Sequence, residues 1–224
     1  MTRTILCIIL LLFSLCTPAM AEPEIHVSIP AFVLQVYDNG KIIKEYPIAV
    51  GTPAEQTPIG RFKILNKIVD PTWYPGAKFE NKTPVPPGPA NPFGSRWMEF
   101  KSGYGIHGTN KGWDINYPVF GGCIKMQDAD VRELFDLVSG GTPVTITYET
   151  MFLIEKTDGL YLKQLPDIYS RHTNTPERFH HLLSLISKNM CCHRETGRYR
   201  RYLTLKQSTK PRWLCPKYQQ LCFS

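Results

Sequence analysis

The sequence predicts a mainly β domain with one clear amphipathic helix. Three observations predict this fold class: short runs of alternating apolar and polar residues, turn residues between those runs, and one segment whose apolar residues recur with the helical period. Alternation with a period of two buries one face of a strand, so several such runs form a sheet over a core. We therefore expect a sandwich-like or partly rolled sheet.

The first expected element is a β-hairpin. Side chains alternate over residues 32–37, and Asp38-Asn39-Gly40 follows directly. Because Asn-Gly favours a tight hairpin turn, a second strand is expected over about residues 41–50. Another strand is expected in "GRFKILNKIV", after a Thr-Pro-Ile-Gly turn, and two short ones are expected in "RWMEFKSGYGIHGT" around Gly103.

A long segment between these strands, "DPTWYPGAKFENKTPVPPGPANPFG", is rich in Pro, Gly and Asn and lacks periodicity. Loops of this length in compact domains are usually functional. One interpretation is therefore that this segment forms a lid or a wall of a substrate site, and the other is that it is an irregular surface loop.

The helix is expected within "QDADVRELFDLVSGG". Its apolar residues recur at helical spacing: Val131, Leu134, Phe135 and Val138. Asp128 precedes them as the expected N-cap, and two glycines follow them as a stop signal. The alternating segment "TPVTITYE" then closes the domain as a strand.

Residues 1–21 have the layout of a cleaved signal peptide, with Arg3 near the start, an apolar run and the ending Ala-Met-Ala. The apolar run is shorter than the about 20 residues that a spanning helix needs. We therefore expect export, to the periplasm or the cell wall.

Residues 22–149 are expected to form the domain, and residues 150–224 a basic C-terminal extension that is partly disordered. Within the extension, a hairpin around Asp158-Gly159 and a short helix starting after Pro176 are expected. The net charge of +7 arises in the extension, because the two signs nearly balance in the domain. A solvated end and a contact with anionic wall polymers or a membrane surface both fit, and no nucleic-acid partner is expected.

One cysteine, Cys123 in "YPVFGGCIKM", lies between the expected signal peptide (the leader) and the C-terminal extension (the tail). A cysteine nucleophile needs a nearby base, because the thiolate is the reactive species. His107 in "YGIHGT" is the natural partner, since the domain's other histidine, His26, lies near its start. The backbone amides around Gly122 and Cys123 are expected to donate hydrogen bonds to the oxyanion that develops when the sulfur attacks a carbonyl. A buried structural thiol is the alternative on chemistry alone.

The segment "YGIHGTNKGWDINYPVFGGCIKM" resembles the signature of the L,D-transpeptidase catalytic (YkuD-type) domain. The resemblance extends to "TPIGRFKI", "GPANPFGSRWMEF" and "DADVRELFDLVSGGTPVTI". It implies an L,D-transpeptidase-like β-sandwich or rolled sheet, with one helix after the catalytic cysteine, and it covers most of the expected domain.

Functional positions of the family match four residues: Cys123 as nucleophile, His107 as general base, Gly108, whose carbonyl orients that base, and Gly122 in the oxyanion region. The resemblance implies acyl transfer on peptidoglycan stem peptides through an acyl-enzyme on Cys123. The products are 3–3 cross-links or proteins attached to the cell wall. It implies a monomer and no cofactor. No metal is expected, because zinc-ligand spacing is missing from the tail.

Three residues depart from the family's pattern: Phe120 replaces Ser or Thr, Gly121 replaces a second His, and Lys125 replaces Arg. These departures keep open a catalytically weakened peptidoglycan-binding relative, and a wall peptide hydrolase is a further alternative. Tyr104, Trp113 and Lys125 are the expected substrate-binding residues, although scattered aromatic residues also fit a core role.

Overall fold

The computed structural model describes residues 22–76, 79–81, 83–119, 121–156, 159–192 and 205–207. The expected signal peptide, Phe120 and most of the tail, including Cys215 and Cys222, lie outside the described residues. Within those ranges the fold is mainly β, as expected, and none of the helices is long and apolar enough to cross a membrane.

Two sheets and their helices make up the described chain. The strands of the large sheet are β1 (Glu24–Ser28), β2 (Val33–Asp38), β3 (Lys41–Gly51), β4 (Gly60–Lys63), β5 (Asn66–Val69), β6 (Arg96–Lys101), β7 (Tyr104–His107), β8 (Pro118–Val119), β9 (Ile124–Met126) and β10 (Pro143–Thr147). The other elements are the 3-10 turn η1 (Gly112–Asp114), α1 (Asp128–Leu137), β11 (Met151–Lys156), β12 (Gly159–Gln164), α2 (Pro176–Cys192) and β13 (Leu205–Gln207).

The large sheet curls on itself. Its strand order is β4-β10-β1-β2-β3-β9-β7-β6-β5, with β8 paired to β3. The end strands β4 and β5 are separated in the chain by Ile64 and Leu65 alone. The buried Ile64 bonds to residues 141 and 142 on the β10 side, while the amide of Leu65 donates to Glu99 of β6 at 2.7 Å. The single strand expected in "GRFKILNKIV" is therefore two, because this corner turns the chain from one sheet edge to the other.

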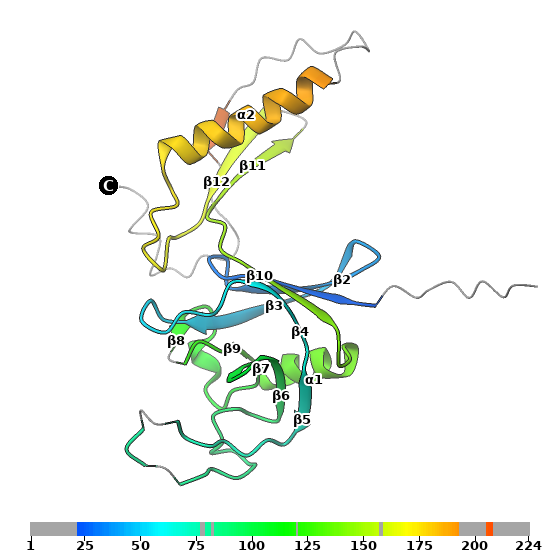
Figure 1. Cartoon of the computed structure of the whole chain (residues 1–224), viewed down its shortest axis with the longest axis vertical. Helices are drawn as coiled ribbons and strands as arrows, with labels where there is room; N and C mark the ends of the chain where they lie inside the picture. The colour runs from blue at the N-terminus through cyan, green and yellow to red at the C-terminus, as the bar shows by residue number, and fades with distance from the viewer. Residues whose placement is uncertain are drawn as a thin grey trace, which may run out of the picture.

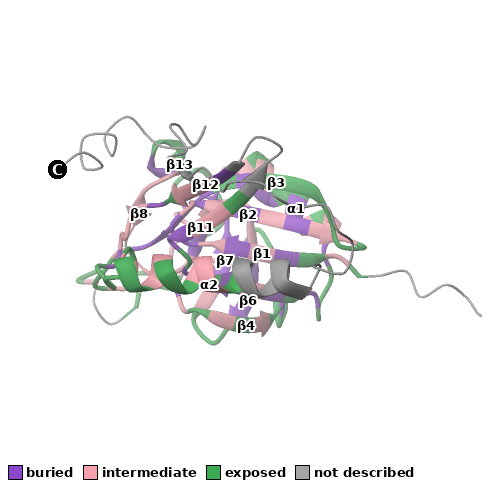
Figure 2. Ribbon diagram, turned by 90° about the horizontal axis from the view of Figure 1, so that it is seen from above, coloured by how far each residue is buried: buried purple, intermediate pink, exposed green. Residues whose placement is uncertain are grey.

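The core lies between the curled sheet and α1. Apolar residues from β1, β2, β3, β6, β7, β9 and β10 are buried, and α1 adds Val131 and Leu134. Figure 2 shows the buried segments at the centre of the body. The expected hairpin between β2 and β3 is confirmed, with positive φ at Asn39 and Gly40 in its turn.

The expected N-cap role of Asp128 is wrong, because α1 begins at Asp128 and Gln127 occupies the N-cap position. The Asp128 carboxylate reaches across to β6 instead. It accepts hydrogen bonds from the Ser95 amide at 2.7 Å and the Ser95 hydroxyl at 3.0 Å, and it pairs with Arg132. This side chain joins the start of the helix to the start of β6.

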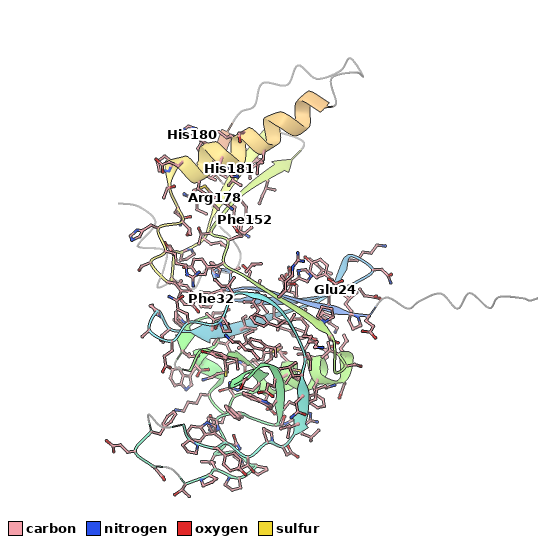
Figure 3. The ribbon with its side chains drawn as sticks, viewed as in Figure 1. Glu24, Phe32, Phe152, Arg178, His180 and His181 are labelled. Carbon is pink, nitrogen blue, oxygen red and sulfur yellow. The ribbon has the colours of Figure 1, made fainter. Side chains whose placement is uncertain are left out.

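The C-terminal elements form a separate layer above the curled sheet (Figure 1). β11 and β12 make the expected hairpin, and β13 adds in parallel to β12. α2 starts at Pro176 as expected, with the Thr175 hydroxyl accepting the Arg178 amide at 3.2 Å, but it extends further than a short helix. His180 and His181 lie on α2 in this layer (Figure 3).

The return segment, residues 165–175 between β12 and α2, ties this layer to the curled sheet. The rings of Tyr148 and Tyr169 stack at 5.1 Å, and the Tyr169 amide donates to the Tyr148 hydroxyl at 2.7 Å. The Tyr148 hydroxyl in turn donates to Asp167 at 2.6 Å. Tyr169 therefore belongs to the buried core, although it follows the expected boundary at residue 149.

The long Pro- and Gly-rich loop lies at the end of the domain opposite the C-terminal layer (Figure 1). The buried Asn91 is its main anchor. Its side-chain amide donates to the carbonyls of Pro71, Val85 and Pro86, and its oxygen accepts the Phe93 amide at 2.8 Å. One side chain thus satisfies four backbone groups of a segment without regular structure.

We expect Asn91→Ala to lower the free energy of unfolding by about 1–3 kcal/mol, because it removes the buried side chain whose amide bonds the carbonyl of the buried Pro71 and whose oxygen accepts the Phe93 amide. Urea unfolding measures this loss. Asn110→Ala is the matched control, since the exposed Asn110 makes a single bond to the Pro89 carbonyl. Equal losses in the two variants would contradict the anchoring role.

Candidate active site

Parallel pairing of β7 with β9 places the two segments that carry the reactive candidates side by side. Ile106 lies opposite Ile124, and His107 lies opposite Lys125. Cys123 immediately precedes β9, two residues before Lys125. Because side chains two apart on an extended chain point to the same face, we expect Cys123 on the His107 side of the sheet.

His107 is buried, and its ring orientation is fixed. Nδ1 lies 2.6 Å from the Gly108 carbonyl oxygen, which can only accept, so Nδ1 carries the hydrogen. This leaves Nε2 as the basic nitrogen. The ring lies 4.7 Å from the ring of Phe93 and stacks on Trp97 at 5.8 Å.

Burial lowers the pKa of His107 to about 3. The bond to the Gly108 carbonyl acts in the opposite direction, and the charge of Lys125 lowers the pKa further. The imidazole is therefore neutral at physiological pH, which is the form that accepts a proton.

Gly108 is packed too tightly for a side chain. A Cβ there would lie 2.5 Å from Oδ1 of Asp128 and 3.3 Å from Cα of Gly94. Although burial acts to raise it, hydrogen bonds from Ser95 and the Arg132 ion pair hold the pKa of Asp128 below its ordinary value. The carbonyl that orients His107 thus belongs to a residue wedged against the charged start of α1.

Cys123 follows a turn of two left-handed glycines, Gly121 with φ of 110° and Gly122 with φ of 70°. Its partly exposed thiol lies 3.9 Å from the Gly103 carbonyl oxygen. Tyr104 lies against the same turn, because a Cβ on Gly122 would be 2.9 Å from its ring. The expected oxyanion and substrate residues Gly122 and Tyr104 are therefore neighbours of the thiol.

Lys125 makes a contact that sequence reasoning missed. Its Nζ lies 2.8 Å from Oδ2 of Asp114, and both side chains are largely buried. No donor among the described residues reaches Oδ1 of Asp114. The sequence offered two separate signals, an acidic residue between the His and Cys motifs and a lysine after Cys123 where arginine is usual.

Trp113, the third expected substrate-binding residue, is 77% exposed on η1. The turn that carries it is held at both sides, by the Asp114–Lys125 pair and by the Gln127 side chain, which donates to the Gly112 carbonyl at 2.9 Å. Trp113 is thus an exposed aromatic ring on an anchored turn between the two reactive residues.

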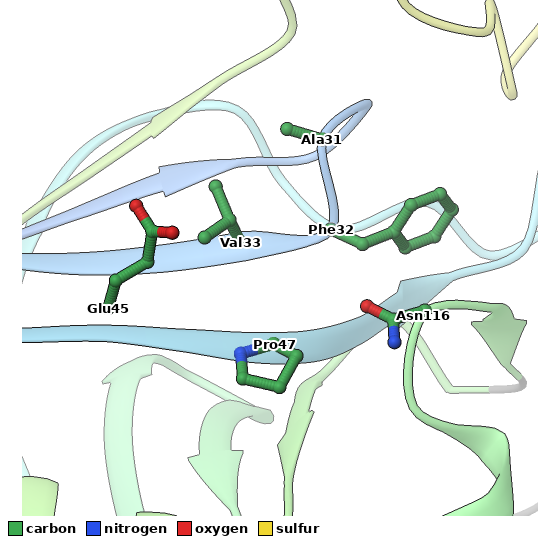
Figure 4. Close-up of a pocket in the computed structure, with 6 residues that line it drawn as sticks. All are labelled: Ala31, Phe32, Val33, Glu45, Pro47 and Asn116. Carbon is green, nitrogen blue, oxygen red and sulfur yellow. The ribbon is translucent and has the colours of Figure 1, made fainter. Parts of the chain in front are cut away.

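Two hollows in the described part of the chain have linings that include neither His107 nor Cys123. The larger, about 460 Å³, is lined on one side by Thr109 and Asn110 and on the other by the long loop and the start of α1. The smaller, about 40 Å³, lies by β2 and β3 (Figure 4). No group of three or more metal-ligating side chains occurs in the described part of the chain.

These features define a curled, mainly β domain in which a histidine ends one strand and a cysteine precedes the parallel strand beside it. The chain belongs to the YkuD family of L,D-transpeptidase catalytic domains, whose profile matches residues 22–146. Members of this family are acyltransferases with a cysteine nucleophile.

An L,D-transpeptidase YkuD of Bacillus licheniformis is 37% identical over 140 residues, which are 60% of this chain and 74% of that protein. Among solved structures, the catalytic domain of an Enterococcus faecium L,D-transpeptidase is 28% identical, with a TM-score of 0.46 over 58% of this chain and 99% of that one. An L,D-transpeptidase from Mycobacterium smegmatis is 22% identical, with a TM-score of 0.48; the match covers 57% of this chain and 59% of that one. The family assignment rests on the sequence matches.

The buried neutral His107 predicts acid sensitivity. Between its pKa of about 3 in the fold and about 6.5 in the unfolded chain, the unfolded chain binds one more proton. Stability is therefore complete above about pH 6.5 and falls by about 1.4 kcal/mol per pH unit below it. We expect His107→Asn to remove this contribution, as measured by urea unfolding at pH 7 and pH 5. The exposed His26→Asn is the control, and an unchanged pH slope in His107→Asn would contradict the assignment.

The Lys125–Asp114 ion pair predicts that stability depends on whether the cation is a single ammonium or the forked guanidinium of arginine. Lys125→Met leaves the Asp114 carboxylate buried without its cation and should cost about 3–5 kcal/mol. Lys125→Arg should retain or raise stability, because its fork offers a donor to each Asp114 oxygen. Thermal unfolding measures both. Lys44→Met, which breaks the exposed Lys44–Glu133 pair, should cost much less than Lys125→Met, and an equal loss at both sites would refute the importance of the buried pair.

Proposed function

We propose that the protein is an exported cysteine L,D-transpeptidase that acts on peptidoglycan stem peptides. The observation that supports this most is the 2.6 Å contact between Nδ1 of His107 and the Gly108 carbonyl. Because that contact leaves Nε2 as proton acceptor, a histidine on the strand beside Cys123 is ready to act as its base.

In the proposed reaction, Nε2 of His107 takes the Cys123 proton, and the sulfur attacks the carbonyl of the third, diamino residue of a donor stem. The tetrahedral oxyanion forms near the amides that follow Gly121. The bond to the terminal D-alanine then breaks, and the leaving amine takes the proton from His107. An amine of a second stem, or of a wall-attached protein, resolves the thioester and restores the thiol.

Burial affects the timing of the first proton transfer. Since burial lowers the pKa of His107, its protonated form is disfavoured in the resting enzyme. We expect a neutral thiol and a neutral imidazole in the resting enzyme, with the proton moving as the carbon–sulfur bond forms. The negative charge that develops on the substrate then compensates the positive ring.

Three residues are proposed for substrate binding, two of them by direct contact and the third indirectly. Tyr104 lies beside the glycine turn, and Trp113 presents an exposed ring between the two motifs. Lys125 acts through Asp114, which holds the turn that carries Trp113. The leader supports export to the periplasm or cell wall, and we propose a monomer that uses no cofactor.

A catalytically weakened relative that binds wall peptides is the second candidate. Gly121 favours it, because the polar side chain usual at that position is missing beside the thiol. A wall peptide hydrolase shares the acyl-enzyme and differs in using water rather than an amine to resolve it.

We expect a carbapenem to form a covalent adduct on Cys123, because the sulfur attacks the β-lactam carbonyl and opens the ring as His107 takes its proton. Intact-mass measurement should show one added inhibitor. Cys123→Ala should abolish the adduct, and His107→Ala should slow its formation by about 10²–10⁴-fold, the usual contribution of a general base.

Muropeptide analysis separates the candidate functions. Transpeptidation predicts 3–3 dimers, or protein attachment, that require both the chain and an acceptor amine. Trimmed stems without dimers would indicate the hydrolase. A wild-type chain that forms no adduct and changes no muropeptide, while retaining its fold, would support the binding relative and refute the proposed enzyme.

A further inference from the structure

The loop that follows β3, residues 52–57, lies directly against the glycine turn before Cys123. The Gly121 amide donates to Oε2 of Glu55 at 2.7 Å. A Cβ on Gly122 would lie 3.1 Å from the Gln56 carbonyl oxygen and 3.3 Å from that of Glu55. The 52–57 loop and the turn are thus in contact through both a side chain and the backbone.

The end of β3 reinforces this contact. A Cβ on Gly51 would lie 2.8 Å from Cα of Gly122 and 2.0 Å from the Glu55 carbonyl oxygen. The two backbones therefore pack closely at glycine, and the turn has little room to move toward β3.

Internal bonds and the return segment brace the 52–57 loop. Within the loop, the Glu55 amide donates to both oxygens of Thr52, at 3.1 Å and 3.2 Å. The Thr57 hydroxyl accepts the Gly51 amide at 2.8 Å, and the Thr57 amide donates to the Tyr169 hydroxyl at 3.1 Å. Thr57 and Tyr169 are buried, so the loop is a fixed support for the Glu55 carboxylate.

The turn itself needs such a support. Two consecutive glycines have more backbone freedom than any other pair, and both have positive φ here. An oxyanion site works when its amides already point to the developing charge, so that no reorganisation is needed during reaction. A charge-assisted bond to the first amide of the turn restricts the peptide planes that follow.

We infer that Glu55 is a positioning residue: its carboxylate anchors the Gly121 amide and thereby orients the amides of Gly122 and Cys123 toward the oxyanion. This inference rests on the proposed acyl transfer. Glu55 acts through the backbone of the turn and not on the substrate.

The test compares two reactions at the same sulfur. Carbapenem acylation passes through an oxyanion, whereas iodoacetamide alkylation displaces iodide from carbon and forms none. We expect Glu55→Ala to slow acylation about 10–100-fold. Removing one donor from an oxyanion hole typically lowers kcat about 10²–10³-fold, and here the donors stay but lose their support. Alkylation and the thermal midpoint should change little.

Two further variants separate the effect of losing the hydrogen bond from the effects of losing a negative charge or of changing any exposed glutamate. Glu55→Gln keeps an oxygen acceptor without the charge, so acylation should stay within about threefold of wild type. Glu45→Ala is the matched control, because Glu45 is an exposed β3 residue that accepts a bond from Gln35 at 2.6 Å. Its acylation rate should equal that of the wild type.

Wild-type acylation in Glu55→Ala would overturn the inference. An equal loss in Glu55→Gln and Glu55→Ala would also overturn it, because the charge rather than the bond would then matter. So would a parallel loss of acylation, alkylation and thermal stability. If the wild type forms no adduct, the proposed function fails separately, and hydrogen exchange at the Gly121 amide then decides. Exchange should be faster in Glu55→Ala, and unchanged exchange would refute the anchor.

Discussion

The site depends on the parallel pairing of β7 with β9. His107 ends one strand, Cys123 precedes the other, and the connection between them leaves the sheet and returns alongside. Parallel neighbours need such a crossover, which is usually a helix. Here its described part holds one 3-10 turn and the short strand β8, which pairs with β3, and side chains add to that backbone support. The Asp114–Lys125 pair does this, since it joins the crossover to the strand that follows Cys123.

Close backbone contacts at glycine complete the scaffold. Gly108 is wedged between Gly94 and Asp128, and Gly122 lies against Gly51. The first contact places the carbonyl that orients the histidine, and the second places the turn before the thiol. The base and the nucleophile are thus each supported from a different part of the curled sheet, and the same curl brings those parts together.

Local signals predicted local structure well. The Asn39-Gly40 turn and the apolar spacing of α1 each lie within a few residues, so the sequence alone indicated the hairpin and the helix. The break between β4 and β5 was missed because it depends on closure of the sheet. The partners of Lys125 and of the Gly121 amide were missed because each contact depends on how the chain folds back on itself. The direction of a backbone amide also cannot be predicted from residue types alone.

The left-handed Gly121 bears on how inhibitors would distinguish this chain from its relatives. Apart from Gly121 and its chain neighbours, no atom of the described residues lies within 4 Å of where a Cβ would stand on Gly121, in the turn that leads to the sulfur. The family's pattern has an imidazole at that position, and Gly121 leaves this side chain out. A compound whose substituent is directed at Gly121 would therefore meet a different surface in this chain than in a relative that carries the imidazole.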